Sequence, residues 1–200
     1  MSKTSFNPQD YYFNEAKKYG YVARSAFKLQ EIDEKYHIFD HHTKSIIDIG
    51  CSPGSWTQYA HRITWGKAKI IWLDLKPSVP NLNNVYTYVC DATNIEQSTA
   101  IFEENSIGKV DVIMSDLAPN TTGLKDIDAL KCVGVLEDTL WIYRNHLKPD
   151  GKFAIKIFMW PGFEEFVKEC KDTRWANNIR VFKPKACRSI SKETYVVKRQ

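Results

Sequence analysis

The chain of 200 residues lacks the cysteine patterns that stabilise secreted or zinc-binding proteins. Its five cysteines are odd in number and widely spaced, without a C-x-x-C pair, which argues against a disulfide framework and against a zinc site. His41 and His42 are adjacent, but neighbours cannot bind one metal from one helix face, and the sequence has no second cluster. We therefore expect reduced cysteines and no metal.

A long apolar run is also missing. Residues 154–160 form one of the longest, but a lysine interrupts it and it is far shorter than the roughly 20 residues that cross a bilayer. The first residues, MSKTSFNPQDYYF, have no apolar core of the kind found in secretory signals. Because 43% of the residues are hydrophobic and the 9 glycines are scattered, disorder and collagen-like structure are disfavoured. We expect one folded domain in the cytoplasm, with no membrane partner.

Acidic charge is scarce at both ends of the chain. Residues 1–30 have a net charge of +3 and residues 171–200 a net charge of +7, although the whole chain has only +4. Both ends also contain aromatic residues, including four tyrosines between positions 11 and 21. Basic side chains attract phosphates, and flat side chains stack on unpaired bases, so the pattern suits RNA. On composition alone, a solvated basic tail is the slightly better interpretation.

Short apolar runs alternate with helical patterns through the middle of the chain, which predicts a parallel sheet covered by helices on both faces. The predicted strands are rich in β-branched or aromatic residues and span residues 45–49, 69–74, 85–89, 110–115 and 153–158. Apolar residues at helical spacing predict helices over residues 22–36, 128–147 and 163–170.

The end of the chain predicts a change of strand direction. The sequence KPDG at residues 148–151 is expected to stop the long helix and to turn the chain into the strand at 153–158. Two last strands, at 179–182 and 195–198, are too close together for a helical crossover. This spacing favours antiparallel pairing.

A glycine-bearing turn follows the first predicted strand, with the sequence DIGCSPGSW at residues 48–56. Glycine lets the backbone approach a ligand closely, and the helix that follows offers free N–H groups. The turn is not G-x-G-x-x-G, and Ser55 follows Gly54 where a P-loop needs lysine. These differences disfavour a nicotinamide-dependent oxidoreductase and a P-loop kinase or GTPase.

Acidic residues stand at the ends of the next two predicted strands. Asp74 ends the second strand, twenty residues after Gly54, where a doubly wound sheet places a carboxylate that accepts bonds from ribose hydroxyls. Asp91 follows the third strand, where a carboxylate can accept a bond from an adenine amino group. One such acid alone is best interpreted as a helix N-cap, but three successive strand ends with Asp or Gly predict a site for an adenosine-containing cofactor.

A lysine lies inside a strongly apolar predicted strand. Lys156, in FAIKIF, is costly to bury unless it is paired or functional. Asp116 follows the fourth strand at the same edge, so a plain buried ion pair between the two is one interpretation. If the last strand is antiparallel, Glu193 before it reaches this edge as well, and three charges converge.

These motifs together resemble the FtsJ-like family of S-adenosylmethionine-dependent 2'-O-ribose RNA methyltransferases. The resemblance covers nearly the whole chain and rests on YVARSAFKL at 21–29, the turn at 48–56, SDLAPN at 115–120, KIF at 156–158 and residues 188–195. It implies an α/β fold of the Rossmann-like class I methyltransferase type, with a seven-stranded, mostly parallel sheet, one antiparallel strand and helices on both faces.

The resemblance also implies a domain division and the residues of the site. In one domain of residues 1–200, residues 1–40 would be an extension that contributes to RNA binding and catalysis, and residues 41–200 the core. The family's catalytic set of Lys, Asp, Lys and Glu corresponds to Lys28, Asp116, Lys156 and Glu193. Its contacts to S-adenosylmethionine correspond to Gly54, Trp56, Asp74, Asp91 and Asp116.

The chain departs from the family pattern at two places. The family's A-P-G-G becomes SPGS here, so Ser55 adds a side chain near the methionine portion of the cofactor, which we expect to be tolerated. The family's Gln-Gly after the phenylalanine of the fifth strand becomes Met159-Trp160. Trp160 could stack on a nucleotide, but packing against the protein is the better interpretation.

Methyl transfer from a sulfonium to a ribose oxygen needs a base beside the hydroxyl. Lysine acts as a base only where its site disfavours the ammonium form. Burial in an apolar strand and the nearby cation of Lys28 both favour the uncharged amine. We interpret Lys156 as the proton acceptor, Lys28 and Glu193 as groups that position the ribose, and Asp116 as serving both lysine and cofactor.

The resemblance favours a uridine of large-subunit (23S-type) ribosomal RNA as the substrate, held by the basic ends of the chain. A tRNA 2'-O-ribose methyltransferase is the close alternative, because it shares the same four residue types. A non-catalytic RNA-binding ribosome-assembly factor is the alternative from another class. We expect a cytoplasmic monomer whose partner is ribosomal RNA in the large subunit.

Overall fold

The computed structural model describes residues 8–77, 81–117, 119, 125–159, 163–171, 176–188 and 191–199. Trp160, and with it the choice between stacking and packing, lies outside these residues. The helices are α1 (Pro8–Lys18), α2 (Ala26–Tyr36), α3 (Ser55–Ile63), α4 (Ile95–Glu104), α5 (Lys125–His146) and α6 (Phe163–Lys171). The strands are β1 (Ser45–Ile49), β2 (Lys69–Asp74), β3 (Val85–Val89), β4 (Val110–Ser115), β5 (Leu147–Phe158), β6 (Ile179–Phe182) and β7 (Glu193–Lys198).

The strands of the described residues form one sheet of seven strands in the order β3-β2-β1-β4-β5-β7-β6. The strands from β1 to β5 pair in parallel, whereas β7 runs antiparallel to both β5 and β6. The prediction of a mostly parallel sheet with one antiparallel strand is therefore confirmed. Because β7 is reversed, its first residue, Glu193, pairs with Phe158 at the carboxyl end of β5.

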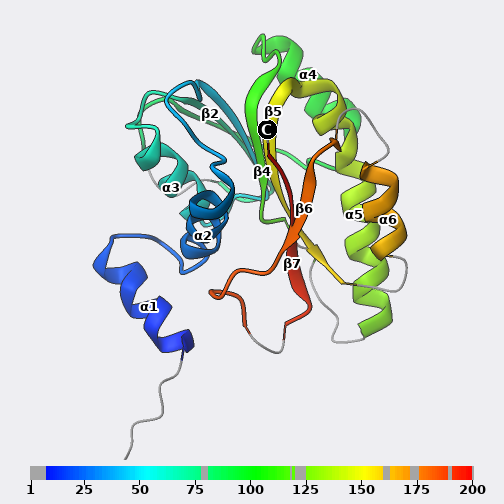
Figure 1. Ribbon diagram of the computed structural model, residues 1–200. Coiled ribbons are helices and arrows are strands. Elements are labelled where there is room, and N and C mark those ends of the chain that lie inside the picture. The colour runs from blue at the N-terminus through cyan, green and yellow to red at the C-terminus, as the bar shows by residue number, and fades with distance from the viewer. Residues whose placement is uncertain are drawn as a thin grey trace, which may run out of the picture.

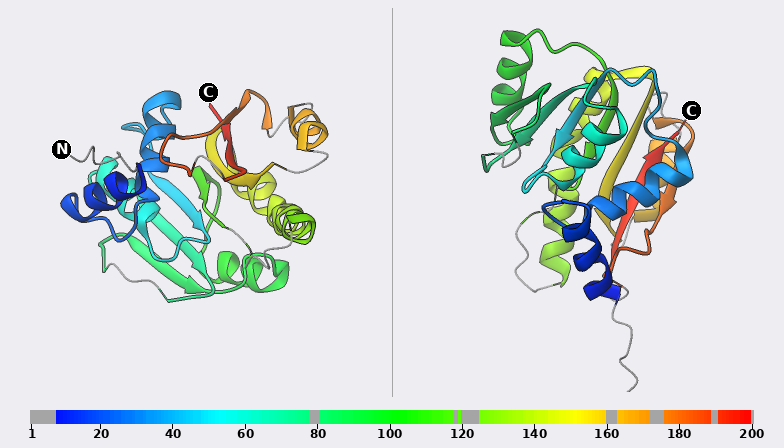
Figure 2. Two further views of the ribbon diagram at one scale, coloured as in Figure 1. Left: turned by 90° about the horizontal axis from the view of Figure 1, so that it is seen from below. Right: turned by 90° about the vertical axis from the view of Figure 1, so that its left-hand side faces the viewer.

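Helices cover both faces of the sheet (Figures 1 and 2). Successive residues of a strand point to opposite faces, so Ile46 packs in the core that includes α2 and α3. Ile47 and Ile49 pack in the core that includes α4, α5 and α6. The inner strands β1, β2 and β4 are mostly buried on both sides, as their nearly continuous apolar sequences predict, whereas the edge strands β3 and β6 are partly exposed. No helix in the described ranges has both the length and the apolar character needed to cross a bilayer.

The predicted strand boundaries agree with the structure except at β5 and β7, while the predicted helices differ near their ends and the sequence patterns did not predict α1 or α4. The bounds of β1 to β4 are the predicted ones, while α2 begins later and β7 begins two residues earlier than predicted. α5 ends at His146, so the predicted stop of the long helix is confirmed, but β5 begins at Leu147 and not at residue 153. Val110 pairs with Leu147 and Val112 with Lys152, which leaves residues 148–151 bulging opposite Asp111 within the strand.

Candidate active site

A cavity of about 510 Å³ opens where the parallel strands end. Its lining includes residues at or just after the carboxyl ends of five neighbouring strands, namely Gly50, Asp74, Asp91, Asp116 and Lys156. The volume is in the range of small-molecule sites, about 300–1,000 Å³. Ligands of open α/β sheets bind at this edge, so the cavity is the candidate cofactor site.

Two of the acids at this edge are held in place by main-chain N–H groups. Asp74 Oδ2 accepts a bond from the N–H of Ser52 at 2.8 Å, and its Oδ1 accepts one from the N–H of Lys76 at 2.8 Å. Asp91 Oδ1 accepts bonds from the N–H and the hydroxyl of Thr93 at 3.0 and 2.6 Å. Fixed carboxylates on two adjacent strands can receive hydroxyl and amino donors of an adenosine group, so these residues fit the predicted cofactor.

Glycines let the turn after β1 approach its neighbours. Gly50 has φ +68°, and a Cβ at this position would lie 2.6 Å from Leu117 Cα. A side chain at position 50 would therefore push apart the ends of β1 and β4. Gly54 has φ 106° and precedes the first turn of α3, in a left-handed conformation that favours glycine.

In the part of the chain that the structure describes, Ser55 and Trp56 are not among the residues that line this cavity. Trp56 is 1% exposed, and its Nε1 donates to the main-chain oxygen of Ser25 at 2.9 Å. The hydroxyls of Ser55 and Ser25 are 2.6 Å apart. Both side chains therefore fix the segment before α2, and a cofactor contact of Trp56 stays a prediction.

Lys28 reaches the same edge from α2. Its Nζ lies 2.5 Å from Glu193 Oε1, and both side chains are 12% exposed. Burial lowers the pKa of Lys28, but the carboxylates of Asp116 and Glu193 outweigh burial and raise it. Burial raises the pKa of Glu193, but the charge of Lys28 and the hydrogen bonds from Lys28 and Tyr195 lower it overall. Both groups are therefore charged at neutral pH, so Lys28 suits positioning better than proton acceptance.

Lys156 forms the second half of the charged cluster. Its Nζ is 3.1 Å from Asp116 Oδ1 and also donates to the main-chain oxygen of Asp116. The structure therefore brings together all four residues that the family pattern selects, although their roles stay predictions.

Tyr195, to which no sequence motif assigns a role, connects the two ion pairs. Its hydroxyl is 2.5 Å from Glu193 Oε1 and 3.1 Å from Asp116 Oδ1, and the residue is 0% exposed. It stands opposite Lys156 in the β5–β7 pairing. Since Tyr195 and Glu193 are two residues apart on one strand, they share a face, and that spacing is the signal that could have identified it.

A fully buried carboxyl lies beneath the candidate site. Asp48 in β1 accepts a bond from the hydroxyl of Thr57 at 2.5 Å, whereas its Oδ1 has no hydrogen-bond partner among the described residues. The pKa of Asp48 is raised to about 8, chiefly by burial. The hydrogen bond from Thr57 lowers this pKa, and the charges of Asp116 and Asp74 raise it. Asp48 is therefore mostly neutral at pH 7 and connects β1 to α3.

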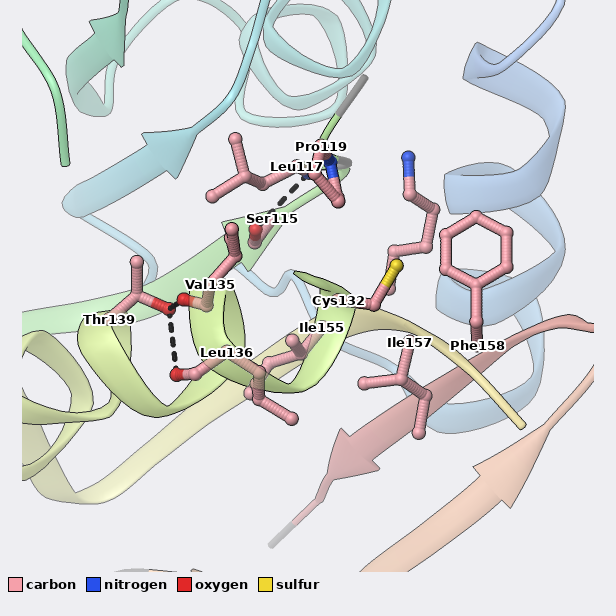
Figure 3. A pocket seen from close by; sticks show the side chains of 11 residues that line it. Ser115, Leu117, Pro119, Cys132, Val135, Leu136, Thr139, Ile155, Ile157 and Phe158 are labelled. Atoms are coloured by element: carbon pink, nitrogen blue, oxygen red, sulfur yellow. Dashed lines mark hydrogen bonds between the residues drawn. The ribbon is translucent and has the colours of Figure 1, made fainter. Parts of the chain in front are cut away.

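A smaller hollow of about 20 Å³ adjoins the cavity between α5 and the ends of β4 and β5 (Figure 3). Cys132, Val135 and Thr139 contribute from α5, and Ile155 and Ile157 from β5. The hydroxyl of Thr139 bonds to its own helix, at the main-chain oxygens of residues 135 and 136. The hollow is large enough for about one water molecule and too small for a nucleotide.

Solved structures of methyltransferases share this fold. A crystal structure from Plasmodium falciparum, reported as a ribosomal RNA methyltransferase, has a TM-score of 0.77 and 26% identity, covering 90% of this chain and 98% of that one. Human methyltransferase-like protein 13 in complex with SAH has a TM-score of 0.57 at 16% identity, covering 78% and 72%, and supports the fold alone. The sheet and its cavity therefore define a Rossmann-like methyltransferase fold.

Sequence comparison identifies the family. The FtsJ-like methyltransferase family matches residues 21–200. Two relatives are named ribosomal RNA large subunit methyltransferase E. The one from Desulfatibacillum aliphaticivorans is 40% identical, covering 94% of this chain and 89% of the relative. The one from Pelagibacter ubique is 39% identical, covering 98% and 95%. The chain belongs to the FtsJ-like methyltransferase family, so the predicted resemblance is confirmed.

Proposed function

We propose that this protein transfers a methyl group from S-adenosylmethionine to the 2'-hydroxyl of a ribose in RNA, and that the substrate is a uridine of large-subunit ribosomal RNA. The names of the relatives support the substrate. One observation carries the chemistry: Lys156, paired with Asp116, lines the same cavity as Asp74 and Asp91. A lysine is thereby next to the site that suits an adenosine cofactor.

In this proposal Asp74 accepts bonds from the ribose hydroxyls of the cofactor and Asp91 accepts from its adenine amino group. Gly54, which precedes α3, and Trp56, in the first turn of α3, would hold the methionine portion. S-adenosylmethionine, when bound, supplies a methyl group on a positively charged sulfur. Membership of the FtsJ-like methyltransferase family supports this choice of cofactor.

The protein's own task is to align the ribose hydroxyl and to accept its proton. Lys156 Nζ accepts the proton of the ribose hydroxyl in its uncharged amine form, and the Asp116 carboxylate at 3.1 Å stabilises the ammonium that results. Lys28 and Glu193 orient the ribose, and Tyr195 connects their pair to Asp116. General-base assistance contributes about 10²–10⁴-fold, and alignment of the reacting groups contributes the remainder.

The proposal includes the organisation of the chain. Residues 1–40 form an extension that contributes to RNA binding and catalysis, and residues 41–200 form the core. The basic ends hold RNA phosphates without reading sequence. The protein acts in the cytoplasm as a monomer.

The proposal is tested by incubating the protein with labelled S-adenosylmethionine and, separately, undermethylated large subunits, free large-subunit ribosomal RNA and bulk tRNA. We expect label on a uridine 2'-oxygen in ribosomal RNA, located by nuclease digestion and mass spectrometry. Label in tRNA alone would replace the proposed substrate with the tRNA alternative. Binding of RNA and cofactor without any transfer would favour the non-catalytic assembly factor.

A further inference from the structure

The Glu31 carboxylate joins three segments that are far apart in the sequence. Glu31 Oε2 accepts a bond from the main-chain N–H of Lys185 at 2.5 Å, and Oε1 accepts one from the N–H of Ala186 at 2.9 Å. Oε1 also accepts a bond from the hydroxyl of Tyr12 at 3.0 Å. One side chain of α2 therefore bonds both to α1 and to the connection between β6 and β7.

This contact is part of a longer seam along one face of α2. Lys28, three residues before Glu31, binds Glu193, and Lys35, four residues after it, lies 4.2 Å from the centre of the Phe182 ring. Residues at this spacing share a helix face. Figure 1 and the left view of Figure 2 show the segment after β6, in orange, passing alongside α2. Glu31 is the middle contact of this seam.

Both joined segments carry exposed groups that suit RNA. Lys185 and Arg188 are exposed in the β6–β7 connection. On α1, Tyr11 is 47% exposed, with its ring 5.3 Å from that of Tyr12, and Lys17 is exposed as well. Lysine and arginine bind phosphates, and exposed aromatic rings stack on unpaired bases.

We propose that Glu31 is a positioning residue that joins the two basic ends of the chain into one RNA-binding surface beside the Lys28–Glu193 pair. This inference rests on the proposed RNA substrate. The carboxylate is negative and lies among basic groups, so by charge alone it weakens RNA binding. Its proposed benefit comes from holding the main chain of residues 185–186 and Tyr12 in place. The sign of the effect on RNA affinity therefore separates positioning from charge.

The test compares Glu31→Ala and Glu31→Gln with the control Glu34→Ala. Glu34 is an exposed residue of the same helix, and its carboxylate accepts a bond from Gln30 at 2.8 Å. Filter binding to free large-subunit ribosomal RNA at several salt concentrations gives the affinity, and methyl transfer to the same RNA gives KM and kcat. Cofactor binding shows that each variant retains its core.

We expect Glu31→Ala to weaken RNA affinity on the order of tenfold, because bonds to a charged acceptor are lost. KM should rise more than kcat falls, and the salt slope should become shallower by about 1–2 as phosphate contacts are lost. Glu31→Gln, which keeps one acceptor oxygen, should lie between Glu31→Ala and wild type. Glu34→Ala should bind RNA as well as wild type or slightly better.

Wild-type affinity or tighter binding in a folded Glu31→Ala variant would overturn the inference, as would an equal loss in Glu34→Ala. A second measurement needs no variant: hydrogen exchange of the wild type with the same RNA. Protection of residues 11–19 together with residues 183–188 supports one joined surface, and protection of only one segment contradicts it. If the wild type binds RNA but transfers no methyl group, the proposed function fails while the role of Glu31 is still measured.

Discussion

Two lysines of β5 show how similar residues differ at the two ends of the sheet. Lys152 and Lys156 are four residues apart on one strand, and each side chain is 9% exposed. Lys152 Nζ is 2.8 Å from Asp40 Oδ2, and Lys156 Nζ is 3.1 Å from Asp116 Oδ1. By burial and pairing alone, the two lysines are equivalent.

Their surroundings differ. Lys152 also donates to the main-chain oxygen of His37, so it connects β5 to the end of α2. Lys156 lines the large cavity, and Tyr195 connects its partner Asp116 to a second ion pair. Burial and pairing of a lysine are therefore not by themselves evidence of a catalytic role. What distinguishes the carboxyl edge is a connected cluster of charges beside a cavity.

The largest expected difference between Lys152 and Lys156 is in the effect of replacing each lysine by alanine. Lys156→Ala should lower methyl transfer by at least about 10²–10⁴-fold because the proton acceptor is lost, with cofactor affinity near wild type. Lys152→Ala should instead lower the free energy of unfolding by about 1–3 kcal/mol and leave kcat unchanged. Single-turnover assays, calorimetry of cofactor binding and urea unfolding measure these effects. An active Lys156→Ala enzyme would refute the assignment.

The connection through Tyr195 can be tested with a milder change. Tyr195→Phe removes one hydroxyl that lies within hydrogen-bonding distance of two carboxylates and can donate to one of them at a time, so kcat should fall about 10–100-fold, the equivalent of about 1.4–2.7 kcal/mol. The control is Tyr59→Phe, since the Tyr59 hydroxyl donates to the buried carboxylate of Asp33 at 2.9 Å in the core with α2 and α3. Tyr59→Phe should lower the free energy of unfolding and leave kcat unchanged. Equal rates for Tyr195→Phe and wild type would show that the two pairs act independently.

The pH dependence of stability has opposite signs at the two ends of the strands. The pKa of Asp48 is about 8 in the folded protein and about 3.9 in the unfolded protein. Between about pH 4 and about pH 8 the carboxyl is therefore protonated in the folded state and ionised in the unfolded state. The stability that this proton contributes therefore falls as pH rises from about 4 to 8, by at most about 1.4 kcal/mol per pH unit. Asp48→Asn, which stays neutral, should remove this dependence in urea unfolding across pH.

Asp40 provides the comparison at the amino edge. Burial raises the pKa of Asp40, but the hydrogen bonds from Lys152 and from the main-chain N–H of His42, together with the charge of Lys152, outweigh burial and lower the pKa overall. Its contribution is therefore present above the unfolded pKa of about 3.9 and is lost as pH falls through the folded value. Asp40→Asn should lose stability at neutral pH and approach wild type in acid. The same pH profile for both variants would contradict the difference between the edges.

Much of the site could be predicted because parallel strands bring their carboxyl ends to one edge. Asp74, Asp91, Asp116 and Lys156 each follow from the position of a strand in the sequence, and all four line the cavity. The bulge at 148–151 could not be predicted, because proline and glycine suit a turn and a bulge equally well. Only pairing with β4 determines which one forms.

The sequence by itself determined the alternation of strands and helices, the acids at strand ends and the family motifs, since these depend on local periodicity and spacing. The tertiary structure decided the contacts between distant segments. Tyr195 bonds to Asp116 only because β7 is antiparallel in one register, and Glu31 meets residues 185 and 186 only because α2 lies along the β6–β7 connection. Such contacts depend on how whole elements pack against one another, and no local pattern of residues specifies that packing.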